Sequence, residues 1–279
     1  MKKKPIQKNL VFLILDSVRY DHLLMARTPR MKKLGKVQKR FSYASWTAPS
    51  HLVYAMGLLP HQSQRNVFAS QIYEKEMSQW KIRLSLPSLS SEKFLPRMGL
   101  SDALRSEGYG SHGIVSMPVL NPNTPLALLF DTYKQMPTYN DFSGIVDEVK
   151  FFEGKPDFYF VNVGDTHYPY GLVGPMVPHL NGLHGTLKHL GKKQAEANLK
   201  NQKRFFTKKN LRMMADAQIA CIENIDSNLE ELFNKCPPNT HLIITSDHGE
   251  LFGEDGFFGH GPVMHPKVFE VPLIEGIVP

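Results

Sequence analysis

Three short runs of consecutive apolar residues constrain the fold of this chain most strongly. They are Leu10–Leu15 (LVFLIL), Phe158–Val163 (FYFVNV) and His241–Thr245 (HLIIT). Short continuous apolar runs are typical of strands that are buried on both faces of a parallel sheet. Because helical patterns separate the runs, the sequence predicts an α/β fold in which helices cover both faces of a mostly parallel central sheet.

The segments between the runs differ in how clearly they predict helices. Leu100–Glu107 has a helical pattern and leads into a short strand at Gly113–Val115. Leu211–Phe233 carries apolar residues at helical spacing over its whole length. Ala69–Leu95 and Gly171–Leu190 have no clear period, so we expect loops or short helices that border a pocket.

Length and composition predict one catalytic domain over residues 1–279. Hydrophobic residues make up 42% and charged residues 21% of the chain, which is ordinary for a globular protein. The formal charge of +7 favours an acidic partner or an anionic substrate. Much of this charge lies in Lys188–Lys209, which is interpreted either as a solvated helical face or as a docking surface.

The N-terminus and the cysteines bear on location. Three lysines precede Leu10–Leu15 as in a signal peptide, but the apolar run is short and no small-residue cleavage site follows it. No apolar segment is long enough to span a bilayer. Two cysteines imply no disulfide framework. We therefore predict a cytoplasmic protein without a membrane span.

Polar residues follow each apolar run at the point where the predicted strand ends. Asp16, Asp165 and Asp247 occupy these places, and His248 follows Asp247 directly. In open α/β sheets, ligands bind beyond the carboxyl ends of the strands, so these side chains are expected to converge. Asp16, Asp247 and His248 together suit a divalent cation with an open coordination position. Taken singly, each of them could instead cap a helix.

Thr47 is a candidate nucleophile. It precedes Ala48 and Pro49 and then a helix-like run, Ser50–Met56, so its hydroxyl is expected near a helix N-terminus, where negative charge is favoured. Coordination to a metal lowers the pKa of a hydroxyl and makes it a better nucleophile. The alternative interpretation is that Thr47 or Ser50 only caps that helix.

Four ordered motifs turn these separate features into a family resemblance. They are LILDSVRYDHL, WTAPSHLVYAMGLLPH, DTHYPY, and SDHGELFGEDGFFGHG with VPLI downstream. In this order they resemble the sulfatase branch of the alkaline phosphatase superfamily. The resemblance implies an alkaline-phosphatase-like three-layer sandwich. Because the sequence ends at VPLIEGIVP, we expect this sandwich to lack the usual C-terminal subdomain.

The resemblance also assigns roles to individual residues. Metal binding falls to Asp16, Thr47, Asp247 and His248, with Thr47 as the metal-bound nucleophile. Substrate contact falls to His51, which replaces the motif's arginine, to His167, and to His260, which stands where sulfatases usually have a lysine.

Departures from the family pattern decide between chemistries. Sulfatases oxidise a Cys or Ser to formylglycine, and Thr47 cannot follow that route, so phosphorus esters are favoured over sulfate esters. Ser17 stands where many sulfatases have a further metal-binding aspartate, which favours one divalent ion, with Zn or Mn preferred and Ca or Mg as alternatives. A second metal, held by Asp165, His167, His260 and His265, is less favoured. The alternatives are that Asp165 orients His167 or caps the following turn.

The predicted function is that of a metal-dependent hydrolase of phosphodiesters, phosphonate monoesters or phosphomonoesters that acts through a covalent Thr47 intermediate. Alternatives, in order, are a transferase of the phosphoethanolamine or phosphoglycerol type, a sulfate-ester hydrolase and a catalytically degenerate binding module. The expected partner is an anionic ester, either free, carrier-bound or macromolecular. Nucleic acid is not favoured, because the basic run has only Phe205 and Phe206 interleaved.

Overall fold

The computed structural model describes residues 8–62, 66–89, 99–171 and 206–279. Most of the basic segment Lys188–Lys209 therefore lies outside the described residues, as does Gly171–Leu190 except for Gly171 itself. The interpretations of both segments remain predictions.

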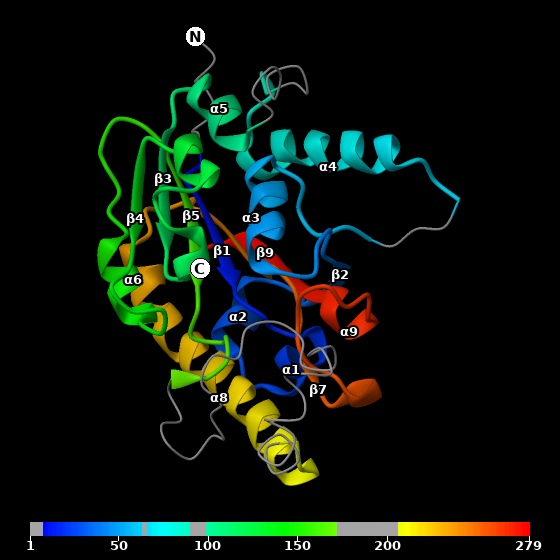
Figure 1. Cartoon of the computed structure of the whole chain (residues 1–279). Helices are drawn as coiled ribbons and strands as arrows, with labels where there is room; N and C mark the ends of the chain where they lie inside the picture. Colours follow the sequence, from blue (N-terminus) through cyan, green and yellow to red (C-terminus); the bar gives the residue numbers. More distant parts are fainter. Residues whose placement is uncertain (1–7, 63–65, 90–98, 172–205) are drawn as a thin grey trace.

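A seven-stranded sheet in the order β2-β9-β6-β1-β5-β3-β4 forms the centre of the molecule (Figure 1). Its strands are β1 (Leu10–Leu15), β2 (Gln38–Phe41), β3 (Gly110–Val115), β4 (Thr132–Gln135), β5 (Asp157–Val163), β6 (His241–Ser246) and β9 (Glu270–Ile277). The three predicted apolar strands occupy the middle of this sheet as β1, β5 and β6. A separate two-stranded sheet pairs β7 (Leu251–Phe252) with β8 (Phe258–Gly259).

The sheet is mostly parallel, as the sequence predicts. β1 pairs in parallel with both β5 and β6, and β3 pairs in parallel with both β4 and β5. β9 runs antiparallel to both of its neighbours, β2 and β6. In the register of the central strands, Leu15 lies opposite Val163 on one side and Ser246 on the other. The chain therefore leaves β1, β5 and β6 at the same level, which is the edge where the candidate residues lie.

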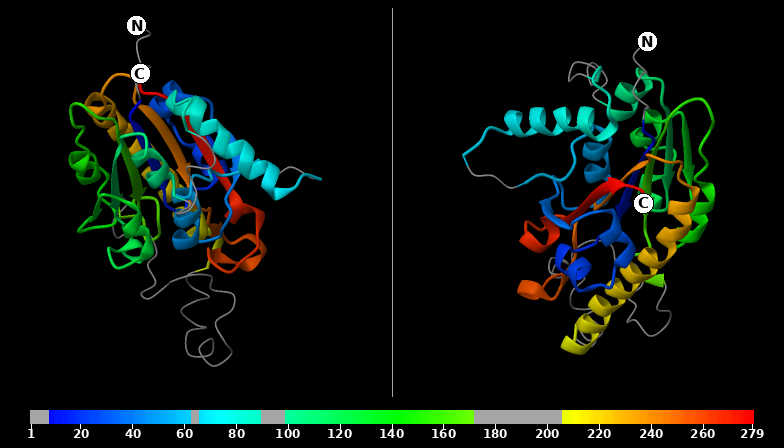
Figure 2. Two further views of the ribbon diagram at one scale, coloured as in Figure 1. Left: turned by 90° about the horizontal axis from the view of Figure 1, so that it is seen from above. Right: turned by 180° about the vertical axis from the view of Figure 1, so that it is seen from behind.

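Helices cover both faces of the sheet, which confirms the three-layer sandwich (Figure 2). One face packs against α1 (Tyr20–Met25), α2 (Pro29–Leu34), α6 (Phe142–Glu148) and α8 (Lys208–Lys235). The other packs against α3 (Thr47–Ala55), α4 (Ala69–Leu84), α5 (Leu100–Arg105), η2 (Pro118–Leu120) and η3 (Pro125–Leu129). The short elements η6 (Glu254–Gly256) and α9 (Pro266–Phe269) lie between β7 and β9 in the chain.

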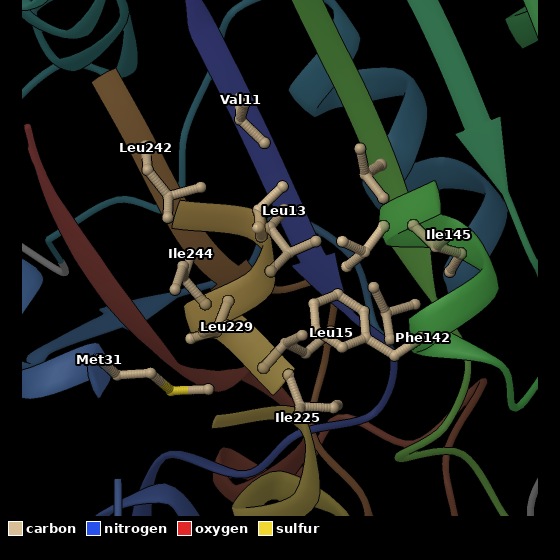
Figure 3. Packing of buried hydrophobic residues seen from close by; sticks show 14 of the residues in the cluster. Val11, Leu13, Leu15, Met31, Phe142, Ile145, Ile225, Leu229, Leu242 and Ile244 are labelled. Atoms are coloured by element: carbon tan, nitrogen blue, oxygen red, sulfur yellow. The ribbon is translucent and has the colours of Figure 1, made fainter. Parts of the chain in front are cut away.

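Alternation along β1 explains why its sequence is apolar throughout. Leu13 and Leu15 point to the layer that contains α8, where Ile225 and Leu229 meet them (Figure 3). Phe12 and the residues two positions before and after it in β1 point to the opposite face and pack into the other layer. Successive strand residues face opposite sides, so a strand between two helical layers needs apolar residues at every position.

The helix α4 contradicts one expectation. We expected loops or short helices over Ala69–Leu95, but α4 spans sixteen residues of that segment. Trp80 and Leu84 are fully buried, and Met77 packs partly against the same core. This apolar stripe is narrow and lies in an otherwise polar segment, so its helical period is weak in the sequence.

Candidate active site

Two carboxylates and an imidazole meet at the carboxyl ends of β1 and β6. One ligand atom from each of Asp16, Asp247 and His248 lies within 4.8 Å of the others, and all three side chains are fully buried. His248 Nε2 lies 3.3 Å from Asp247 Oδ2 and 3.9 Å from Asp16 Oδ1. Within the described residues this is the one group with metal-ligand geometry.

The two oxygens of Asp247 have different surroundings. Oδ1 accepts hydrogen bonds from the backbone N–H of Ser17 at 3.0 Å and of His248 at 2.9 Å. Oδ2 is buried and has no hydrogen-bond partner. An unsatisfied buried carboxylate oxygen is costly, and coordination of a cation would satisfy it.

The tautomer of His248 is fixed by its other ring nitrogen. Nδ1 donates to the backbone carbonyl of Gly249 at 2.9 Å, so Nε2 carries the lone pair that points at Asp16 and Asp247. Metal-binding histidines are commonly oriented by such a bond to a carbonyl. The donor set therefore fits a divalent cation.

Electrostatics support the same conclusion. Burial, followed by the charge of Asp16, raises the pKa of Asp247 well above its usual value. Burial also raises the pKa of Asp16, but the surrounding histidines, His167 foremost, outweigh this and lower it overall. Burial, followed by His260, lowers the pKa of His248 well below its usual value, so this imidazole is neutral. Two adjacent buried carboxylates beside a neutral imidazole need a cation to be charged together.

Thr47 is the first residue of α3, so its predicted place at a helix N-terminus is confirmed. Its Oγ1 lies 3.4 Å from His248 Nε2, and the residue is 4% exposed and lines a cavity. The hydroxyl is thus the group that lies between the metal-binding residues and the space open to a substrate.

His51 does not line that cavity, although we expected it to contact substrate. It is fully buried, and its Nδ1 donates to the carbonyl of Thr47 at 2.8 Å. Its Nε2 accepts from the Asn162 amide at 3.1 Å. His51 lies four residues after Thr47 in α3, and its side chain points back toward the start of the helix, where it holds the backbone carbonyl of Thr47.

Asn162 is a site residue that the motifs missed. Its Nδ2 also donates to Asp16 Oδ2 at 3.2 Å, so this one amide holds both a metal-binding carboxylate and His51. Its Oδ1 accepts from the backbone N–H of Met117 at 3.0 Å. The signal was a lone amide side chain inside the apolar run of β5.

Ser17 orients both carboxylates. Its backbone N–H donates to Asp247, and its Oγ donates to Asp16 Oδ1 at 3.1 Å. It holds φ at 63°, a left-handed conformation that is uncommon for residues other than glycine. The structure thus gives this position a positioning contact in place of the carboxylate that many sulfatases carry there.

His167 and His260 lie together at the cavity wall, as the resemblance implies for substrate-contacting groups. Their ring centroids are 5.3 Å apart, and the His260 ring lies 4.1 Å from that of His248. His260 Nδ1 lies 3.4 Å from Glu250 Oε1, and Glu250 Oε2 accepts from the Tyr170 hydroxyl at 2.6 Å. Glu250 is a further site residue for which the sequence assigned no role.

Asp165 lies apart from the metal-binding group. Its Oδ1 accepts from the backbone N–H of Phe142, the first residue of α6, at 3.4 Å. Burial raises its pKa to about 6. Neither Asp165 nor His265 belongs to the cluster with metal-ligand geometry, and His265 instead caps α9. The geometry gives no support to a second metal at Asp165.

A cavity of about 730 Å³ opens beside Thr47. Its walls come from six stretches of the sequence: the start of α3, the region around η2, Tyr139, the loop after β5, Glu250 and the turn around β8. We call this cavity the ester chamber. Its size is typical of pockets that hold small molecules.

Several solved structures share the fold of this chain. A 2-O GAG sulfatase aligns with a TM-score of 0.61 and 14% identity over 97% of this chain and 64% of its own. The periplasmic domain of a phosphoethanolamine transferase from Campylobacter jejuni aligns at 0.57 and 14%, over 96% and 78%. The chain therefore shares its fold with a sulfatase and with a phosphoethanolamine transferase domain.

A phosphonate monoester hydrolase from Agrobacterium radiobacter shares the same fold, with a TM-score of 0.55 and 15% identity over 96% of this chain and 68% of its own. No family model and no curated protein matches the chain. Across the described ranges, no helix is long and apolar enough to cross a membrane. The C. jejuni neighbour is a periplasmic domain, and the cytoplasmic location of this chain stays a prediction.

Proposed function

We propose that this protein is a metal-dependent hydrolase of phosphoryl-type esters in which Thr47 forms a covalent intermediate. The observation that carries the proposal is the position of Thr47 Oγ1, which lies 3.4 Å from His248 Nε2. The same nitrogen faces Asp247 Oδ2, which has no hydrogen-bond partner. The sulfatase-like fold supports an ester-handling enzyme.

The residues of the chain would share the work as follows. Asp16, Asp247 and His248 would hold one divalent cation, which lowers the pKa of the Thr47 hydroxyl and neutralises charge on the ester. The Thr47 hydroxyl loses its proton to solvent, and Oγ1 attacks phosphorus as the bond from phosphorus to the leaving oxygen breaks. His167 or His260 donates a proton to the leaving oxygen. Water then attacks phosphorus and gives one proton back to that histidine, while the bond from phosphorus to Oγ1 breaks and Oγ1 takes up a proton from solvent.

The test compares wild-type protein with Thr47→Ala and Thr47→Ser on four chromogenic substrates: a phosphomonoester, a phosphodiester, a phosphonate monoester and a sulfate ester. We expect the phosphorus esters to be preferred, the alanine variant to lose at least roughly a thousandfold in kcat, and the serine variant to keep part of the activity. Thr47→Ala with wild-type turnover and bound metal would refute the nucleophile. A preference for sulfate would refute the substrate class.

Metal content is measured on the same samples. We expect one equivalent of zinc or manganese per chain, lost in Asp16→Ala and His248→Ala. A purified protein that retains no metal and turns over none of the four substrates is a binding module instead.

A transferase is the second candidate, favoured by the likeness to the phosphoethanolamine transferase domain. The same threonyl intermediate would pass its group to an alcohol in place of water. Turnover in the presence of a chosen acceptor alcohol separates the two functions: transfer product in excess of hydrolysis product identifies a transferase.

A further inference from the structure

The ester chamber is lined mainly by apolar and aromatic side chains. Trp46 and Met117 lie on its wall with Tyr139, Tyr168 and Phe258. Among the described residues that line it, none is a lysine or an arginine. The one carboxylate, that of Glu250, accepts a hydrogen bond from the Tyr170 hydroxyl. The excess positive charge of the chain therefore does not contribute to this described wall.

Apolar exposure continues at the chamber's wall and close to it. Trp46 is 50% exposed and Val119 is 42% exposed, and both line the chamber. Met264, two residues beyond the lining Pro262, is 84% exposed. Apart from His167 and His260, which the proposed function assigns to the reacting ester, this wall gives no counter-charge to a second anionic group, and its apolar surface adds binding energy.

We infer that the ester chamber binds one alcohol group of the substrate, and that this group is uncharged and apolar, such as an alkyl or aryl chain. The inference rests on the proposed function for the position of the ester at Thr47. It narrows the substrate to esters with a single anionic centre, held at the metal-binding residues, and an apolar substituent that extends past Trp46 and Val119.

The substrate series that tests this inference keeps the leaving group constant. It consists of p-nitrophenyl phosphodiesters whose second alcohol is methyl, propyl, hexyl or aminoethyl. Because burying each methylene can strengthen binding up to roughly fourfold, even partial burial of the hexyl chain is sufficient for a large effect. We expect kcat/KM to rise at least about tenfold from methyl to hexyl. The aminoethyl ester matches the propyl ester in size but is positively charged, and we expect it to be the poorer of the two.

Two variants separate an effect of the chamber wall from a general effect of added charge, and both leave Thr47 unchanged. Val119→Glu places a charge on the wall and is expected to abolish the rise with chain length. Leu128→Glu, on the neighbouring η3, places the same charge at an 85% exposed residue outside the wall and is expected to leave the rise intact. Thermal unfolding of both variants establishes that they fold.

A binding measurement separates this inference from the proposed function. Alkyl methylphosphonates, from methyl to hexyl, are titrated by calorimetry into Thr47→Ala, so that no turnover is required. If affinity rises with chain length but the wild-type protein turns over none of the phosphodiesters, the proposed function is refuted and the inference about the chamber is supported. If the wild-type protein turns over the esters but kcat/KM is flat from methyl to hexyl, or highest for the aminoethyl ester, the inference about the chamber is overturned and the proposed function stands. If affinity does not rise with chain length and the wild-type protein shows no turnover, the inference about the chamber and the proposed function are both overturned.

Discussion

Replacing Asp247 by asparagine is expected to have opposite effects on stability with and without a divalent cation. The amide oxygen can still accept the hydrogen bonds that Ser17 and His248 donate to Oδ1. The amide NH₂ then replaces Oδ2, which is buried beside Asp16 and has no partner. Without metal, a buried carboxyl beside Asp16 is costly, whereas the amide carries no charge that must be desolvated or neutralised, so the variant is at least as stable as the wild type.

With metal, the order reverses. A cation at a hundred times its dissociation constant stabilises the wild type by about 2.7 kcal/mol. For a chain of 279 residues, the unfolding entropy is roughly 0.6 kcal/mol/K, so Tm rises by about 5 °C. Asp247→Asn loses an anionic ligand and is expected to gain little or nothing from the cation.

The assay is thermal unfolding in a chelator, followed by titration with zinc and, separately, manganese. Asp226→Asn is the matched control, since Asp226 is also buried but accepts hydrogen bonds from the backbone N–H groups of Arg30 and Met31 and does not belong to the metal-ligand group. We expect this control to keep the full metal-induced shift. A wild-type protein that metal does not stabilise, or an Asp247→Asn variant with the full shift, would refute the proposed coordination.

Three further predictions concern stability. Trp80 is fully buried and its Nε1 donates to a backbone carbonyl, so Trp80→Ala should cost about 3–5 kcal/mol in urea unfolding, and Trp80→Phe clearly less; equal losses would contradict this packing. Asn162→Ala should lower stability by about 2 kcal/mol and also weaken metal binding, because it frees Asp16; an unchanged metal affinity would argue against that role. Burial raises the pKa of Glu275, but hydrogen bonds from His241 and Arg83 lower it from 4.5 to about 2, so its stabilisation is present above pH 4.5 and is lost as the pH falls toward 2. Glu275→Gln should flatten this acid-side loss in unfolding experiments, and an identical pH profile would disprove it.

Much of the fold could be predicted because burial on both faces leaves a direct mark on the sequence. β1, β5 and β6 are buried at every position and mainly apolar in sequence, and the structure places all three in the middle of the sheet. The long amphipathic helix α8 was also found, three residues longer at its start and two at its end than predicted. α4 was missed, since it buries only a narrow stripe around Trp80.

The site was predictable only in part. Asp16, Asp247 and His248 follow strands, and parallel strands bring their ends to one edge, so the sequence was sufficient to group them. The positions of His51 and Asn162 were not predictable, because each depends on a bond across elements that lie 111 residues apart in the chain. No periodicity or motif spacing encodes such a pairing.

The sequence by itself thus determined the layered α/β fold and the residue types that favour a metal and a threonine nucleophile. These follow from local patterns, since hydrophobic period and strand-end chemistry are properties of short segments. Only the tertiary structure decided that His51 supports Thr47 from behind, that Asp247 Oδ2 is unsatisfied, and that the space beside Thr47 is apolar. The walls of the chamber come from six separate stretches of the sequence, so its character exists only once the chain has folded.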